Sequence, residues 1–159
     1  MTKTQLKFIS KNKFIKNTFI FTIILFLIDI LTKYFFTNKS YFENSLFFIK
    51  YSQNYGSALS MFSNISYYNT IVILLSFGVL YYLFKNLKEF NHTKLTCLTF
   101  YFLIPGILGN LYDRLFFGFV RDFIGIKNLF IFNMADIYLT FAVILYIIYE
   151  LKQSSFFSR

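Results

Sequence analysis

The sequence has no tryptophan, and only one cysteine, one proline and one histidine occur among its 159 residues. A single cysteine, Cys97, excludes an intramolecular disulfide and a cluster of thiolate metal ligands. With His92 as the one histidine, we expect neither a zinc site nor a nucleophile–histidine triad. Charged residues are also scarce: they make up 14% of the chain, against about 25% in ordinary soluble domains.

Hydrophobic residues, in contrast, make up 57% of the chain and include 25 Phe and 13 Tyr. A soluble domain of this length could not keep so much apolar surface away from water. Too little of the chain is polar for it to be disordered. The composition therefore predicts a membrane protein, and we expect residues 1–159 to form one integral-membrane domain.

Four apolar runs have the ~17–25 residues that a helix needs to cross a bilayer. They lie at about 17–35, 67–84, 95–112 and 134–151. Backbone groups in lipid must be satisfied within each run, so the predicted fold class is an all-α membrane protein with four transmembrane helices. The segment 36–66, between the first two helices, mixes aromatic and polar residues. We expect it to lie on the outer membrane surface as short β-strands or as an amphipathic piece.

The basic residues indicate orientation and not nucleic-acid binding, although the net charge is +9. The N-terminal tail, the 85–94 connection and the C-terminal tail hold ten of the sixteen basic residues. No basic stripe continues into a folded polar domain. Because lysine and arginine accumulate on the cytoplasmic side, this distribution places both termini in the cytoplasm.

All four aspartates fall on the opposite side of the membrane, at helix ends or in a connection: Asp29, Asp113, Asp122 and Asp136. A carboxylate within or beside a span is costly, by about 2.5–3.5 kcal/mol on insertion scales, and usually faces a protein interior. Four of them at one depth predict a shared polar site.

Neighbouring residues supply candidate partners for two of these aspartates. Lys33 follows Asp29 by one helical turn, and Arg114 directly follows Asp113, so we expect two ion pairs. Asn110 and Asn133 each stand three residues before an aspartate, a spacing that puts amide and carboxylate on one face of a helix.

Once these two pairs are assigned, Asp122 and Asp136 remain as the unpaired carboxylates. Two close carboxylates cannot both ionise, so one holds a proton while the other acts as a base toward water. Such a pair is the minimal apparatus for aspartic hydrolysis of a peptide bond. The residues alone leave open whether Asp113 or Asp122 partners Asp136.

Two other classes of function use the same residues. A small transport or proton-relay protein would also carry intramembrane carboxylates, though more typically near the middle of a span. A non-catalytic assembly or anchor subunit would tolerate loss of every aspartate. The residues also have plain structural interpretations: Asp136 could be a helix N-terminal carboxylate favoured by the dipole, and Gly106 and Gly109 are more often a site of close helix packing than catalytic.

Five short motifs in chain order carry a resemblance to a known family. They are Asp29-Ile-Leu-Thr-Lys33, Asn54-Tyr-Gly56-Ser-Ala58-Leu59, Gly109-Asn110-Leu-Tyr-Asp113-Arg114, Val120-Arg-Asp122-Phe123 and Phe132-Asn133-Met-Ala135-Asp136. They are similar to the D-x-x-[ST]-K, N-x-G-x-A-F, G-N-x-x-D-R, V-x-D-F and F-N-x-A-D patterns of bacterial lipoprotein signal peptidase (signal peptidase II), an inner-membrane aspartic peptidase.

The resemblance implies that Asp122 and Asp136 form the catalytic dyad, without metal or cofactor. It implies a substrate-binding or supporting role for a further set: Asp29, Lys33, Asn54, Gly56, Asn110, Asp113, Arg114, Asn133 and Ala135. The implied substrate is a diacylglyceryl-modified prolipoprotein, cleaved just before the lipidated cysteine. A monomer in the membrane lipid, with its active site toward the outer face, is implied as well.

The chain departs from the family patterns at several positions. Leu59 stands where the family usually has Phe, and Pro105-Gly106 where it often has Gly-Gly. Arg121 replaces a usual apolar residue beside Asp122, and we expect it to alter the pKa of Asp122 or the charge preference for substrate. The interval from Asp122 to Asp136 is several residues shorter than the family pattern leads us to expect, and the shortening falls at Gly125-Ile-Lys-Asn-Leu. We expect this to affect a loop over the site.

Overall fold

The computed structural model describes residues 10–37, 40–56, 67–87, 90 and 93–157 of the chain. Four long helices occur in this part: α1 (Lys11–Phe36), α2 (Tyr68–Asn86), α3 (Lys94–Phe116) and α4 (Met134–Phe157). Each is long and apolar enough to cross a membrane. The four expected spans and the predicted class of membrane protein are therefore confirmed.

The helices extend beyond the apolar runs that predict them. Helix α1 begins at Lys11, well before residue 17, and its first turns carry Lys11, Lys13 and Lys16. Helix α3 continues to Phe116, so Asp113 and Arg114 lie in its last turns. A hydropathy pattern marks the length of chain that lipid accepts, whereas the helical hydrogen bonds continue into the polar flanks.

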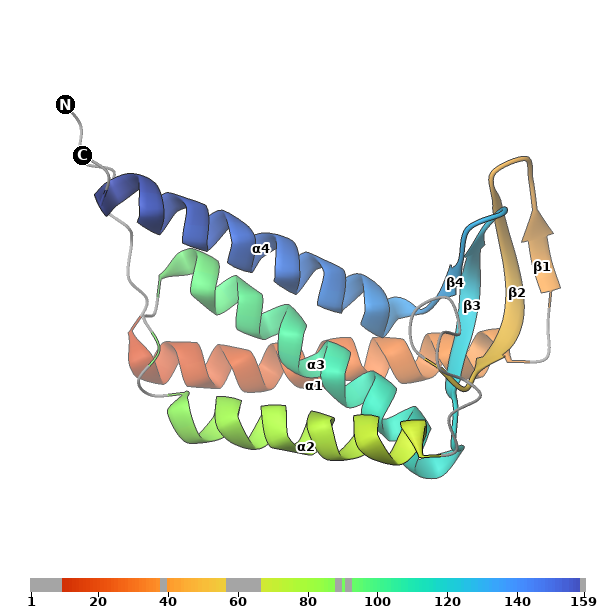
Figure 1. Ribbon diagram of the computed structural model, residues 1–159, viewed down its shortest axis with the longest axis horizontal. Coiled ribbons are helices and arrows are strands. Elements are labelled where there is room, and N and C mark those ends of the chain that lie inside the picture. Colours follow the sequence, from red (N-terminus) through yellow and green to blue (C-terminus); the bar gives the residue numbers. More distant parts are fainter. Residues whose placement is uncertain (1–9, 38–39, 57–66, 88–89, 91–92, 158–159) are drawn as a thin grey trace.

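Helix α3 is the centre of the bundle and packs against the three other helices (Figure 1). Its glycines allow this approach: a Cβ on Gly106 would lie 2.8 Å from Leu139, and one on Gly109 would meet Asp29 and come within 3.0 Å of Ala135. The expected role of both glycines in close helix packing is confirmed.

One end of the bundle is held by apolar packing. Phe14 of α1, Leu83 of α2, and Cys97 and Phe100 of α3 are buried in one cluster. The rings of Phe14 and Phe100 meet edge to face, with centroids 5.6 Å apart. The start of α1 and the end of α4 lie at this end of the molecule, and the sheet lies at the other (Figure 1). The polar residues of the four spans can therefore gather beside the sheet.

The sheet has four antiparallel strands in the order β1-β2-β3-β4. Strands β1 (Ser40–Glu43) and β2 (Phe47–Asn54) follow α1, which confirms the expected strands between the first two helices. Strands β3 (Val120–Ile126) and β4 (Ile131–Phe132) come from the α3–α4 connection. That connection was expected as a plain loop. It is instead a hairpin whose first strand pairs with β2 and is largely buried.

Replacing Gly109 by alanine is expected to destabilise the protein. The added methyl group would be forced against the Asp29 carboxylate and Ala135, both of which are fully buried. Overpacking of this kind costs about 1–3 kcal/mol. Gly78→Ala is the matched control, because a Cβ on Gly78 of α2 meets no atom within 4 Å. Thermal unfolding of the two variants in detergent micelles should show a lower midpoint for Gly109→Ala alone, and equal midpoints would contradict the close packing.

Candidate active site

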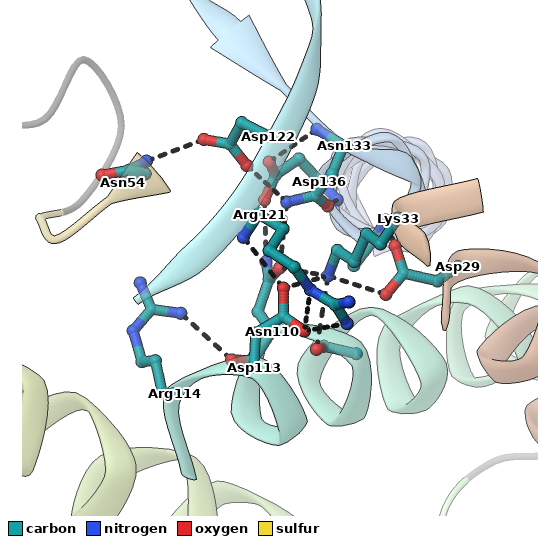
Figure 2. A network of polar contacts seen from close by, with 12 residues as sticks. Asp29, Lys33, Asn54, Asn110, Asp113, Arg114, Arg121, Asp122, Asn133 and Asp136 are labelled. Atoms are coloured by element: carbon teal, nitrogen blue, oxygen red, sulfur yellow. Dashed lines mark hydrogen bonds and ion pairs between the residues drawn. The ribbon is translucent and has the colours of Figure 1, made fainter. Parts of the chain in front are cut away.

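A network of polar side chains lies where the sheet meets the bundle (Figure 2). Its residues come from five elements: Asp29 and Lys33 from α1, Asn54 from β2, Asn110, Asp113 and Arg114 from α3, Arg121 and Asp122 from β3, and Asp136 from α4, with Asn133 just before α4. The four aspartates that the sequence places at one depth thus meet in one cluster.

Lys33 joins two of these aspartates. Its Nζ lies 2.8 Å from Asp29 Oδ2 and 3.3 Å from Asp113 Oδ2, and all three side chains are fully buried. The same ammonium donates to Asn110 Oδ1 at 3.3 Å. The expected Asp29–Lys33 pair is therefore confirmed, and Lys33 also connects α1 to the end of α3.

Asp29 also holds the start of α4. Its Oδ1 accepts a hydrogen bond of 2.9 Å from the main-chain N–H of Ala135, in the first turn of α4. The first N–H groups of a helix have no partner within the helix, so a carboxylate at this place both satisfies one and suits the helix dipole.

The expected ion pair between Asp113 and Arg114 is wrong. Asp113 pairs with Arg121, whose Nη2 lies 2.8 Å from Asp113 Oδ1 and whose Nε donates to the same oxygen at 3.1 Å. Arg114 instead donates to the main-chain carbonyls of Gly56 and Asn110, at 3.1 and 3.4 Å. Successive residues of a helix point about 100° apart, so neighbours in sequence do not face one another.

Asn133 and Asp136 satisfy each other at the start of α4. The N–H of Asp136 donates to Asn133 Oδ1 at 3.0 Å, and the N–H of Asn133 donates to Asp136 Oδ2 at 3.1 Å. This is the reciprocal arrangement of a capping box. The second oxygen, Asp136 Oδ1, accepts from Asn110 Nδ2 at 2.8 Å. Asn110 thus donates to Asp136 and not to Asp113, the aspartate three residues after it. Lys33 contacts both Asn110 and Asp113 and so links them.

Asp122 is held by two amides. Asn54 Nδ2 donates to Asp122 Oδ2 at 3.0 Å, and Asn133 Nδ2 donates to Asp122 Oδ1 at 2.6 Å. Asn133 therefore donates to the Asp122 carboxylate through its side chain and to the Asp136 carboxylate through its main-chain N–H. The main-chain N–H of Gly56 donates in turn to Asn54 Oδ1 at 3.0 Å, which fixes the orientation of the Asn54 amide.

The four carboxylates thus fall into two chemically different pairs. Asp29 and Asp113 lie against the cations of Lys33 and Arg121. Each oxygen of Asp122 and Asp136 accepts a hydrogen bond from a neutral amide or main-chain N–H. Asn133 donates a hydrogen bond to each of these two carboxylates. Among the described residues, no three His, Cys, Asp or Glu side chains are placed to hold a metal ion.

The pKa of Asp122 is raised to about 7, first because burial disfavours its charge and then because of the nearby carboxylate of Asp136. The hydrogen bonds from Asn54 and Asn133 and the positive charge of Lys33 act in the opposite direction and lower it. Asp122 is 2% exposed. At neutral pH a large share of Asp122 is therefore protonated.

A cavity of about 850 Å³ opens beside Asp136. Its polar lining includes Asn54, Asn110, Arg114 and Asp136. The rest is mainly apolar, from Val72 of α2, Ile107 of α3, Ile137, Leu139 and Phe141 of α4, and Ile131 and Phe132 of β4. An apolar chain can therefore lie between α2 and α4 with a polar group beside the aspartates.

Arg121 does not have the partner expected from its place beside Asp122. It was expected to act on Asp122, but its side chain binds Asp113 and stacks on the ring of Phe117, with 4.3 Å between the guanidinium carbon and the ring centroid. Alternation along a strand would have put Arg121 and Asp122 on opposite faces, had the connection been recognised as β3. Ala58 and Leu59 of the second motif, and His92, lie outside the described residues.

Three comparisons with known proteins agree with the geometry. The family model described as signal peptidase (SPase) II matches residues 21–152. A lipoprotein signal peptidase of Wigglesworthia glossinidia brevipalpis is 35% identical over 136 residues, which cover 77% of this chain and 87% of that protein. One of Streptococcus agalactiae serotype V is 34% identical over 146 residues, covering 86% and 92%.

The fold is also similar to solved structures. One described as a bacterial membrane enzyme has a TM-score of 0.80 and 27% sequence identity, and the match covers 89% of this chain and 91% of that one. A second, with the same description, has a TM-score of 0.76 at 27% identity. The family model spans most of the chain, and the relatives match nearly their whole length. The chain therefore belongs to the signal peptidase II family.

Proposed function

We propose that this protein is a membrane-embedded aspartic endopeptidase that removes the signal peptide from diacylglyceryl-modified prolipoproteins, cutting just before the lipidated cysteine. The observation that carries the proposal is the Asp122–Asp136 pair: neutral donors hold both carboxylates, Asn133 binds both, and Asp136 lines a largely apolar cavity. Relatives named lipoprotein signal peptidase support the peptidase and give no support to a transport or proton-relay protein.

The two carboxylates have different roles in the proposed reaction. Asp136 lines the cavity from the first turn of α4, where a water molecule and the substrate can reach it, so it acts as the base. It takes a proton from water as the water oxygen attacks the scissile carbonyl. Asp122 holds the shared proton and gives it up, so that the leaving nitrogen departs as an amine. The products are a carboxyl-terminated signal peptide and a lipoprotein with a free amino group.

Cleavage is expected to decline as the pH rises through about 7, because Asp122 then loses the proton that it must donate. Asn54→Leu should move this alkaline limb to higher pH, since the Asn54 hydrogen bond favours the ionised form of Asp122. The dependence of kcat/KM on pH for both proteins checks this. A profile that stays flat well above neutrality, or a limb that moves to lower pH in Asn54→Leu, would contradict the assigned role of Asp122.

The apolar and polar parts of the cavity lining suit different parts of the proposed substrate. The apolar walls from α2 and α4 suit the hydrophobic stretch of a signal peptide and the acyl chains of its lipid. Asn54, Asn110 and Arg114 supply polar groups to the cavity lining and position the peptide backbone. Gly56 orients two of them, because its N–H donates to Asn54 and its carbonyl accepts from Arg114. A second set of residues supports the dyad through the ion pairs and the hydrogen bond that join α1, α3 and the start of α4: Asp29, Lys33, Asp113 and Ala135.

The orientation in the bacterial inner membrane follows from charge. Lys11, Lys13 and Lys16 lie at the start of α1, Lys85 at the end of α2 and Lys94 at the start of α3, all away from the sheet. Lysine on that side favours a cytoplasmic location for both termini. The sheet and the dyad then face outward, where exported prolipoproteins arrive, and a monomer holds the whole site.

The proposed function is tested with purified protein in lipid vesicles and two substrates. One is a prolipoprotein that carries the diacylglyceryl group on its cysteine, and the other is the same chain with that cysteine replaced by serine. Cleavage of the lipidated chain alone is expected. If both stay intact, the protein is not this peptidase, and if both are cut equally, the lipid is not part of the recognised substrate.

A further inference from the structure

At the edge of β3 beside the dyad, a carboxylate accepts a main-chain hydrogen bond that a neighbouring strand would otherwise accept. Val120, Arg121 and Asp122 pair with β2 on one side, whereas in the described residues β4 pairs with β3 at Ile124 and Gly125 only. The main-chain N–H of Arg121 donates instead to Asp113 Oδ2 at 2.9 Å. The last turns of α3 therefore supply the acceptor that a neighbouring strand would supply in a longer hairpin.

The Arg121 side chain binds the same carboxylate. Its Nε and Nη2 donate to Asp113 Oδ1 at 3.1 and 2.8 Å, and its guanidinium lies over the ring of Phe117. Arg121 is 7% exposed. Three hydrogen bonds and one stacking contact thus tie this residue of β3 to the end of α3, in a geometry that suits a planar guanidinium and not an ammonium.

Asp113 needs this second cation. Lys33 is shared between Asp113 and Asp29, so one ammonium faces two buried carboxylates. Arg121 supplies a second positive charge, so that two cations face the two carboxylates. Without it, Asp113 Oδ1 loses both hydrogen bonds from the Arg121 side chain, and the carboxylate that accepts the main-chain N–H of Arg121 is held against a cation only through Oδ2 and Lys33.

We propose that Arg121 is a positioning residue for the dyad: by binding Asp113 through side chain and main chain, it holds β3, and with it the Asp122 carboxylate, in place against α3. The inference rests on the proposed function and adds a residue to it. Asp122 points to the opposite face of the strand, toward Asn54 and Asn133, so Arg121 acts through the backbone that the two residues share.

This role has a kinetic signature. Arg121 is not among the residues that line the cavity, so its loss should leave substrate binding unchanged. A small displacement of a catalytic group lowers the rate of the chemical step, by as much as about 100-fold for 1 Å. We therefore expect Arg121→Leu to lower kcat by roughly 10- to 100-fold at an unchanged KM. Arg121→Lys keeps the charge without the planar fork and should fall between wild type and Arg121→Leu.

The experiment measures kcat and KM per folded enzyme with the lipidated prolipoprotein, and thermal unfolding in parallel. Lys127→Leu is the matched control: Lys127 follows β3 directly, and its ion pair with Glu43 is exposed and far from the dyad. It should keep the kcat and KM of wild type. The split between kcat and KM and the partial rescue by lysine together support the positioning role.

Other outcomes overturn it. If Arg121→Leu unfolds at a lower temperature but keeps its kcat, Arg121 serves stability alone. If Arg121→Leu raises KM at constant kcat, Arg121 acts on the substrate, and if Arg121→Lys recovers fully, charge alone matters. If wild type itself leaves the substrate intact, the proposed function fails instead, so the two failures are distinguishable.

Discussion

Asp122→Asn and Asp136→Asn are each expected to lower kcat by about 10³-fold or more while leaving the fold intact. Asparagine keeps the size of the side chain and one acceptor oxygen, but it neither takes a proton from water nor gives one to the leaving group. Both carboxylates are bound by neutral donors, so neither substitution strands a buried cation. Activity should therefore be lost while the protein stays folded. The loss of stability should be limited to about 1–3 kcal/mol, because the new NH2 group faces one N–H donor whose hydrogen bond the carboxylate oxygen had accepted.

The measurement is single-turnover cleavage with thermal unfolding of the same samples. Glu150→Gln is the matched control, because Glu150 is an exposed acid on α4, the helix that also carries Asp136. It should cleave at the wild-type rate. Substantial turnover by either Asp variant would remove that residue from the dyad, and a collapse of the melting transition would give it a structural role instead.

Lys33→Met is expected to cause the largest loss of stability. Among the described residues, the substitution leaves Asp29 with no cation and Asp113 with Arg121 alone, in a site where Lys33, Asp29 and Asp113 are fully buried. Breaking a buried ion pair by removing one partner costs about 3–5 kcal/mol, because the other charge stays buried. Replacing the second partner as well should restore much of this. Lys33→Met combined with Asp29→Asn is therefore expected to be more stable than Lys33→Met alone.

The comparison is with an exposed pair in the same molecule. Lys127 lies 2.8 Å from Glu43, but the two side chains are 39% and 68% exposed. Exposed pairs contribute about 0–1 kcal/mol, so Lys127→Met should change the unfolding midpoint little. Denaturant unfolding in micelles measures all three variants. Equal losses for Lys33→Met and Lys127→Met would contradict the buried cluster.

The transmembrane part of the fold could be predicted because lipid imposes one simple rule on the chain. Apolar runs of bilayer length had to be helices, and the four helices contain nearly every residue of the four runs. The convergence of Asp29, Asp113, Asp122 and Asp136 followed from the parity of the spans. Because successive helices cross the membrane in opposite directions, counting them shows which ends share a side, and this count needs no knowledge of how the helices pack.

Side-chain partners could not be predicted in the same way. The sequence offered Arg114 to Asp113 by adjacency, whereas Arg121 reaches Asp113 from another element. Finding that pair requires the pairing of β3 with β2, which sets the face to which Arg121 points. The strand itself was missed because Val120–Ile126 was read as a connection, and the short β4 gives little periodic signal.

The central claim is that Asp122 and Asp136 hydrolyse the bond before a lipidated cysteine, and the masses of the two products test it most directly. Wild-type protein, incubated with a diacylglyceryl prolipoprotein, should give a signal peptide with a free carboxyl group and a lipoprotein that begins at the lipidated cysteine. The Asp122→Asn and Asp136→Asn proteins should give neither product. A cut at another bond, or the same two masses from either variant, would contradict the account.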